Sequence, residues 1–410
     1  MGGEAETGLD VGPLIRAVDE APPVMAVDVM AGHLAAAFGA SVVAFSIADF
    51  SGRALTRLSY DSQQGAGRQQ GRESGERVPL EGTPHGRVLS AQKIEVEPRK
   101  DGVHVYAPVT NRGEAIGILE LTLPDAPDER TVAKVAVAAH LLAYIVIANR
   151  RFTDLYEWGQ RSVPLTVPAE VQHRLLPGSV TCEAGPFTLA AGLEPAGEVA
   201  GDTFDFTVER DTLHISVTDA MGHGVEASLL ATLLVGSLRN GRRAGVDLAE
   251  QARLADEELC SYLGLKDGFV TGQLARIDLR TGTASIVNAG HPAPVRLRDG
   301  HVETPSLQAD LPFGTTFGGS YQVQPLPLAQ GDRLLFMTDG MIERNAASVD
   351  IQALVARSAG MHPREAVQHV TQAVLRAAHG RLQDDATILC LDWHGPATQE
   401  ATLSAGTDAG

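Results

Sequence analysis

The sequence predicts an α+β protein with two domains joined by a helical linker. With 410 residues the chain is long enough for two domains, and a hydrophobic content of 44% suffices for packed cores. Alternating apolar residues predict strands in both halves, and longer stretches with apolar residues three and four positions apart predict helices. Between the halves, residues 151–180 contain one short helical pattern that ends at Pro177.

Charge and cysteine content narrow the classes of function. The formal net charge of −18 disfavours nucleic acid and anionic membranes as partners, because both attract clustered Lys and Arg. Cys182, Cys260 and Cys390 are far apart and odd in number, so neither a disulfide framework nor a metal knuckle is predicted. The acidic N-terminus lacks the features of a signal peptide, and we therefore expect a cytoplasmic protein.

The N-terminal half is predicted to contain a flexible tail, residues 1–14, followed by a domain over residues 15–150. Its predicted elements are a helical stretch from Leu14 to Phe38 interrupted at Pro22-Pro23, a strand at 41–47, an exposed loop at 63–77, strands at 103–109 and 115–121, and a helix from Glu129 to about Tyr156. Within that helix the apolar run Val135–Ala148 is shorter than the roughly 20 residues that a membrane span needs. We therefore expect a buried or dimer-facing helix, and with it a homodimer.

The order of these elements resembles a GAF sensor domain. The hairpin phrase Tyr106-Ala-Pro-Val109, followed by Gly113-Glu-Ala-Ile-Gly117, is similar to the final strands of that family. The resemblance implies a small-molecule ligand as the signal. Because the region lacks cysteine, thiol attachment of a bilin and thiolate ligation of a haem or cluster are excluded. Scattered histidines are commonly ordinary surface or core residues, but four remain candidate ligands: His33, His85, His104 and His140.

The C-terminal half is organised around Asp219-Ala-Met-Gly-His-Gly224, which lies between a strand and a helix. Leu213, Ile215 and Val217 alternate with polar residues, and Asp219 continues their phase. Its carboxylate therefore points to the buried side, which costs several kcal/mol unless a cation pairs with it. Taken alone, this segment is better explained as a strand-turn-helix junction with a capping Asp.

Three further acidic segments favour a metal site. Each lies at the end of an apolar strand: Asp202 in phase with Phe204, Asp339 in phase with Leu335 and Met337, and Asp384-Asp385 before the strand at 388–391. Four such anions would repel one another unless cations lie among them. Oxygen ligands without clustered His or Cys suit Mg²⁺ or Mn²⁺, and two such ions about 3.5–4 Å apart catalyse phosphoryl chemistry.

These residues resemble a motif series of the bacterial SpoIIE/RsbU-type serine phosphatases, which belong to the PPM (PP2C-like) superfamily. The motifs are Pro195-Ala-Gly-Glu-Val-Ala-Gly-Asp202, Asp219 to Gly224, Asn288-Ala-Gly-His-Pro292, Thr338-Asp-Gly340 with Glu343, and Asp384-Asp-Ala-Thr387. The resemblance covers about residues 185–393. It implies a PP2C-like β-sandwich flanked by helices at 181–394, with a flexible tail at 395–410.

The resemblance also assigns the site. Asp202, Asp219, Asp339 and Asp384 become the catalytic residues and metal ligands, with the Ala220 carbonyl as a further ligand. Asp202 and Asp219 bridge two Mn²⁺ or Mg²⁺ ions, and Asp385 is the alternative to Asp384. Ala200 replaces the usual first glycine of a GGD phrase, and Thr203 stands where an aromatic residue is common. His291 could donate a proton or shape a turn, and the same alternatives hold for His223.

The function that the resemblance implies is hydrolysis of phosphoserine or phosphothreonine on a STAS-type anti-sigma-factor antagonist. The alternatives are a non-catalytic signalling scaffold, which the four filled Asp positions disfavour, and a small-molecule phosphatase. The helix Thr166–Pro177 is either a simple spacer or part of a path from about Glu129 to Leu176 through which the sensor controls the phosphatase. For such control, the family resemblance implies that the helices at 225–238 and 248–263 can serve as a switch beside the metals.

Overall fold

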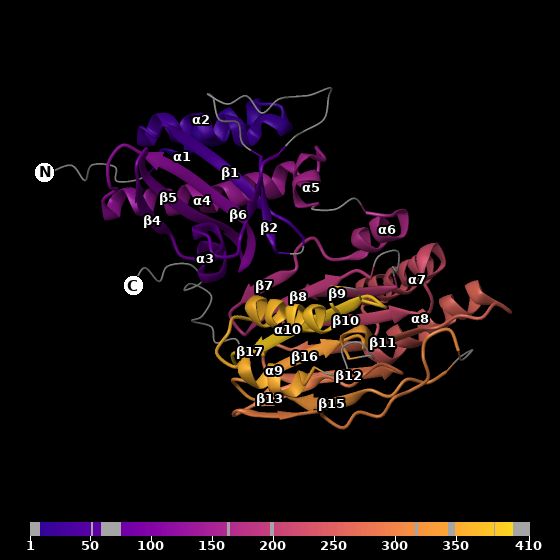
Figure 1. Ribbon diagram of the computed structural model, residues 1–410. Helices are drawn as coiled ribbons and strands as arrows, with labels where there is room; N and C mark the ends of the chain where they lie inside the picture. The colour runs from indigo at the N-terminus through magenta and orange to yellow at the C-terminus, as the bar shows by residue number, and fades with distance from the viewer. Residues whose placement is uncertain are drawn as a thin grey trace, which may run out of the picture. The chain divides into compact units, whose positions relative to one another are not determined.

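The computed structural model describes residues 9–50, 52–58, 75–161, 165–196, 201–315, 319–342, 349–380 and 382–396. The chain divides into two compact units, one ending at Pro164 and one beginning at Leu165 (Figure 1). Several sequence predictions fall outside the described residues: the outer parts of both tails, most of the loop at 63–77, Ala200 and Glu343.

The first unit is built on a six-stranded antiparallel sheet with the strand order β3-β2-β1-β6-β5-β4. The strands are β1 (Val42–Ala48), β2 (Ala54–Arg57), β3 (Arg77–Pro79), β4 (Glu95–Arg99), β5 (Gly102–Asn111) and β6 (Glu114–Leu123). The predicted hairpin is confirmed as β5 and β6. Its two turn residues, Arg112 and Gly113, have φ angles of 46° and 79°, as a tight two-residue hairpin turn requires.

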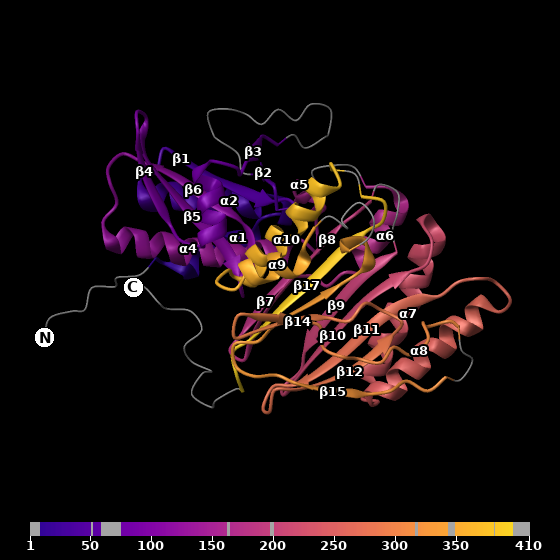
Figure 2. The same cartoon turned by 60° about the horizontal axis from the view of Figure 1, so that its bottom comes forward.

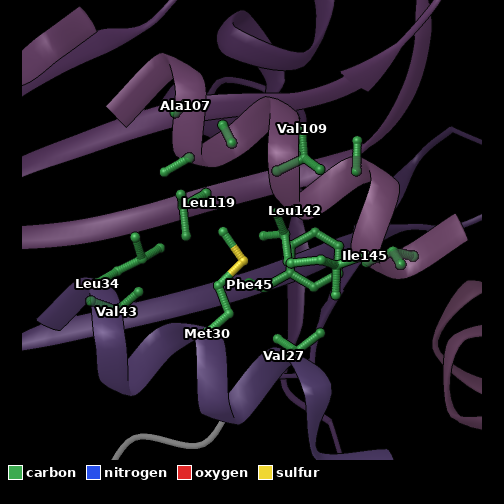
Figure 3. Close-up of a cluster of buried hydrophobic side chains, with 14 of the residues drawn as sticks. Val27, Met30, Leu34, Val43, Phe45, Ala107, Val109, Leu119, Leu142 and Ile145 are labelled. Carbon is green, nitrogen blue, oxygen red and sulfur yellow. The ribbon is translucent and has the colours of Figure 1, made fainter. Parts of the chain in front are cut away.

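Helices complete this unit: α1 (Val11–Glu20), the 3₁₀-helix η1 (Pro23–Met25), α2 (Ala26–Phe38), α3 (Pro84–Ala91), α4 (Glu129–Asn149) and α5 (Leu155–Gln160). The predicted break at Pro22-Pro23 is confirmed, but α1 begins at Val11, inside the predicted tail. Figure 3 shows Met30 and Leu34 of α2 and Leu142 of α4 directed at Phe45 and Leu119 of the sheet. The GAF assignment itself stays a prediction.

Helix α4 differs from its prediction in two ways. It ends at Asn149, and a break precedes α5, so the expected continuous helix to Tyr156 is wrong. It also has 21 residues, and by length and composition alone it could cross a membrane. One side packs into the core through Val135, Ala138 and Leu142, whereas Val137 and Tyr144 are half exposed on the other side.

The opposite face of this sheet carries a buried polar network around Glu120 of β6. Its carboxylate accepts hydrogen bonds from Arg57 at 3.0 Å and pairs with His85 at 3.3 Å and His104 at 3.2 Å. Burial raises the pKa of Glu120, but His85 and Arg57 outweigh burial and leave that pKa below its usual value. Two of the four candidate histidines thus meet at one carboxylate. No group of three side chains suited to a metal forms in the described parts of the chain.

We predict that Glu120→Gln destabilises the first unit by about 1 to 3 kcal/mol at pH 7, because the charged hydrogen bonds are weakened. A carboxyl group whose folded-state pKa is lowered stabilises above its unfolded pKa, and that contribution is lost as the pH falls through the folded-state pKa. The difference between variant and wild type should therefore shrink in acid. Urea unfolding at several pH values measures it. Glu97→Gln, at the surface pairs with Arg87 and Arg99, is the control and should cost under about 1 kcal/mol.

The second unit is a sandwich of two antiparallel sheets. One has the strand order β15-β12-β11-β10-β9 and the other β14-β13-β16-β17-β8-β7. The strands are β7 (Thr181–Ala184), β8 (Phe187–Glu194), β9 (Asp202–Val208), β10 (Thr212–Ala220), β11 (Val270–Asp278), β12 (Thr283–Ala289), β13 (Val295–Arg298), β14 (His301–Glu303), β15 (Gln324–Pro327), β16 (Arg333–Met337) and β17 (Ala386–Trp393). Phe204, Val217, Phe336 and Leu389 are among the residues that fill the space between the sheets.

Helices cover both outer faces of this sandwich (Figure 2). They are α6 (Val167–Leu175), α7 (Gly224–Arg243), α8 (Leu248–Leu263), η2 (Asp339–Met341), α9 (Ile351–Arg357) and α10 (Pro363–Ala377). Helices α7 and α8 pack on the β10–β12 face, and α9 and α10 on the β16–β17 face. The β-sandwich flanked by helices is therefore confirmed. Helix α6, predicted as part of the linker, packs within this second unit.

Candidate functional site

The predicted acidic residues of β9 and β10 lie side by side at one end of the sandwich. Asp202 begins β9, and its register partner is Asp219, near the end of β10. The preceding Gly201 lies so close to β10 that a Cβ atom there would be 2.5 Å from the Ala220 carbonyl oxygen. The second glycine of the motif is therefore required for this approach. The two carboxylates and the Ala220 carbonyl, all predicted ligands, thus belong to one strand pair.

A chain of hydrogen bonds links this strand pair to the other sheet. The backbone N–H of Thr387 donates to Thr338 Oγ1 at 3.0 Å, and the Thr338 hydroxyl donates to Asp202 Oδ2 at 2.7 Å. Thr338 and Thr387 are both fully buried. Asp202 is therefore held by both sheets, and the motifs around Asp339 and Asp384 reach the same end of the sandwich.

Asp339 lies beyond the end of the strand whose phase was used to predict its position. Leu335 and Met337 face α9 and α10, and β16 ends before Asp339, which begins η2 and is half buried. Both faces of β16 are apolar, so the sequence could not distinguish the inner one. Gly340 contacts the Asp385 carbonyl so closely that any side chain would clash, which brings the third and fourth acidic segments together.

The two adjacent aspartates of the fourth segment have different environments. Asp385 is 1% exposed, and its oxygens accept hydrogen bonds from Ala196 N at 2.8 Å and Gln172 Nε2 at 2.6 Å. Asp384 is half buried, and its Oδ1 accepts the backbone N–H of Asp385 at 2.8 Å. Asp385 therefore has the contacts of a structural anchor.

The charges of the neighbouring carboxylates make ionised Asp202 unfavourable unless a proton or a cation offsets its charge. Burial raises the pKa of Asp202 well above its usual value, and the negative charges of Asp219 and Asp385 raise it further. Burial likewise raises the pKa of Asp385, which the hydrogen bonds from Ala196 and Gln172 partly oppose. Clustered anions of this kind favour either a bound proton or a cation.

The donor set fits a hard divalent cation in its chemistry, because carboxylates and a carbonyl are the ligands that Mg²⁺ and Mn²⁺ prefer. The repulsion at buried Asp202 gives an independent reason for a cation at this place. In the geometry of the described residues, however, no three His, Cys, Asp or Glu side chains converge closely enough to enclose an ion. The ligand assignment therefore stays a prediction.

The two histidines of the motifs differ in position. His291 is 4% exposed, its Nδ1 lies 2.8 Å from the Thr271 hydroxyl, and its backbone N–H donates to Asn288 Oδ1. Burial lowers the pKa of His291 to about 4, so its ring is neutral at pH 7 and has no readily donated proton. This favours a role in shaping the turn. His223 is exposed and directly precedes α7.

Sequence reasoning missed two features of the site. Gln172 of α6 is 2% exposed and contacts both Asp385 and the Asp202 carbonyl oxygen, yet an isolated glutamine in a short helix gives no signal. Thr203, noted as a departure from the family pattern, pairs with Thr218 across β9 and β10, with their hydroxyl oxygens 2.5 Å apart. The sequence pattern predicted that Thr203 lies in a strand, but only the strand register shows that Thr218 lies opposite it.

Comparison with known proteins identifies the family of this region. Residues 209–394 match the family described as Stage II sporulation protein E (SpoIIE). Among relatives from Bacillus subtilis, phosphoserine phosphatase RsbU is 21% identical over 55% of this chain and 69% of its own length. Phosphoserine phosphatase RsbP is 22% identical over 47% of this chain and 49% of its own length, so the match spans about half of that protein.

Two solved structures are also similar to this chain. The RsbU and RsbW domains of Rv1364c from Mycobacterium tuberculosis are 27% identical with a TM-score of 0.47, covering 53% of this chain and 63% of that one. The SiaA PP2C domain of Pseudomonas aeruginosa is 20% identical with a TM-score of 0.47, covering 55% and 94%. Residues 209–394 are a SpoIIE phosphatase-family domain.

We predict that Asp202→Asn stabilises the metal-free protein at pH 7 by about 1 kcal/mol or more, because the amide removes the repulsion from Asp219 and Asp385. Its oxygen can still accept the Thr338 hydroxyl. Denaturant unfolding in chelator measures this difference. The control is Asp205→Asn, a nearby buried aspartate that Arg239 and Arg242 neutralise, and it should be destabilised instead. Equal destabilisation of both variants would contradict the repulsion.

Proposed function

We propose that the chain is a metal-dependent protein-serine/threonine phosphatase whose activity the N-terminal unit regulates. The observation that carries this proposal is the carboxylate of buried Asp202, which the charge of half-buried Asp219 on the neighbouring strand repels. The sandwich that holds both residues includes the SpoIIE-family match at 209–394, and its relatives include named phosphoserine phosphatases. A scaffold without catalysis would have no use for such a strained pair, which favours the enzyme over that alternative.

The residues take the following parts in this mechanism. Asp202, Asp219, Asp339 and Asp384 would hold the two cations, with the Ala220 carbonyl as a further ligand. We favour Asp384 over Asp385, because both Asp385 oxygens already accept hydrogen bonds. Two bound Mn²⁺ or Mg²⁺ ions would supply an activated water and neutralise charge on the phosphate under attack. Thr338 holds the Asp202 carboxylate in position through its hydroxyl.

The substrate that family resemblance favours is a phosphorylated STAS-type anti-sigma-factor antagonist, which places the chain in sigma-factor regulation. The N-terminal unit would bind a small-molecule signal as a GAF-like domain. A cytoplasmic location and a homodimer through the half-exposed side of α4 complete the proposal; Val137 and Tyr144 there are 50% and 52% exposed.

We predict that hydrolysis of phosphoserine on such a protein requires Mn²⁺ or Mg²⁺ and stops in excess EDTA. Asp339→Asn should lower the rate by at least about 100-fold at limiting metal while the fold persists, because a ligand is weakened without a change in size. Phosphate release measures the rate. Asp299→Asn, an exposed aspartate outside the site, is the matched control and should keep wild-type activity. Full turnover in EDTA would rule out the two-metal mechanism.

We predict that residues 165–410 alone differ from the full chain in rate or metal affinity, because the N-terminal unit biases the site through the segments α4, α5 and α6. Val171→Pro in α6 should abolish the difference, since proline removes a helix hydrogen bond and kinks the helix. Parallel assays of the three proteins, with and without candidate small molecules, provide the measurement. Identical rates, metal affinities and oligomeric states would leave the linker a spacer.

A further inference from the structure

Helix α6 is attached to the second unit by a small apolar contact and by hydrogen bonds. Only Ala169 and Gln172 of its nine residues are fully buried, whereas Val167 is 72% exposed and Val171 37% exposed. A helix that buries so little apolar surface gains little from the hydrophobic effect, which scales with apolar area removed from water. Buried Ala169 and the packing of Leu175 against the α7–α8 core supply that apolar contact, and hydrogen bonds add to it.

Three hydrogen-bonded points fix this helix. At its start, the Ser228 hydroxyl of α7 lies 3.3 Å from the Pro168 carbonyl and shares its one hydrogen with the nearer Gly224 carbonyl at 2.9 Å. At its end, Arg239 of α7 donates to the Leu175 carbonyl at 2.6 Å. Between them, Gln172 extends inward to the candidate site. Both outer points connect α6 to another helix, and Gln172 connects it to the acidic strands.

The Gln172 side chain joins two of the acidic segments. Its Nε2 donates to the Asp202 carbonyl oxygen at 2.8 Å and to Asp385 Oδ2 at 2.6 Å. The amide nitrogen has two hydrogens, and these two acceptors use both. Asp202 begins β9 and Asp385 directly precedes β17, so one side chain fixes the starts of two strands in opposite sheets.

We propose that Gln172 is a positioning residue of the phosphatase site, and that α6 acts as a latch whose docking sets the spacing of the Asp202 and Asp384-Asp385 segments. This inference rests on the proposed function and deepens it, because it names the contact by which the linker helix controls that site. With α6 docked, the amide ties both segments together. With α6 displaced, a buried carbonyl and a buried carboxylate each lose a donor, and the two segments are free to separate.

The test uses the full chain with Gln172→Met, which keeps the length and approximate volume of the side chain but removes both N–H donors. The matched control is Gln251→Met. Gln251 is a second glutamine, 5% exposed, whose Nε2 donates to the Leu238 carbonyl at 2.8 Å in the α7–α8 contact. Thermal unfolding of both variants shows whether they lose comparable stability, so that loss of a buried amide in general is accounted for.

Two measurements then separate positioning from stability. Calorimetric titration with Mn²⁺ should give at least about tenfold weaker binding for Gln172→Met and wild-type binding for Gln251→Met. Hydrogen exchange of the metal-free proteins should be faster at residues 167–175, 201–203 and 385–387 in Gln172→Met, with no change there in Gln251→Met.

The outcomes distinguish this inference from the proposed function. Equal Mn²⁺ affinity and equal exchange in the two variants would overturn the role of Gln172 and leave the phosphatase assignment intact. If the wild-type chain neither binds Mn²⁺ nor hydrolyses phosphoprotein, the proposed function is wrong, and hydrogen exchange alone then decides whether Gln172 positions the two strand starts.

Discussion

The candidate site of the second unit is organised around one carboxylate, Asp202, whose burial as an anion costs free energy. Asp202 lies beside Asp219 across two neighbouring strands and is 2% exposed, so neither water nor a basic side chain offsets its charge among the contacts described. The surrounding structure keeps it in place through backbone approach at Gly201 and the Thr338 hydroxyl. Stability is given up at this point in favour of a concentrated negative site, as is common where a protein binds a cation.

The sandwich architecture explains how such a site can form. Strand starts and ends from both sheets meet at one end, so segments separated by well over a hundred residues contribute to it. Thr338 lies 136 positions from Asp202, and Asp385 lies 213 positions from Gln172, yet each pair is within hydrogen-bonding distance. The apolar side chains between the sheets, including Phe204 and Phe336, hold the two layers together and make these contacts rigid.

The two units differ in the groups that surround a buried carboxylate. Glu120 in the first unit is surrounded by Arg57, His85 and His104, so its charge is paired and its pKa falls. Asp202 in the second unit is surrounded by other acids, so its pKa rises. The first arrangement offsets the buried charge, whereas the second leaves a negative charge that a proton or a cation would offset.

Much of this could be predicted from sequence. Apolar strand patterns located β1, β5, β6 and β10, and proline and helical spacing located α6, α7 and α8, because these signals are local in the chain. The acidic motifs gave Asp202, Asp219, Asp339 and Asp384 as candidate site residues. Only the tertiary structure showed that α4 ends at Asn149 and that Asp339 begins η2 beyond the strand. It also showed that Asp385 accepts a hydrogen bond from Gln172 and has the contacts of a structural anchor. It alone revealed Gln172. Each of these depends on which distant segment lies opposite, and contact between distant segments is set by the packing of the whole domain.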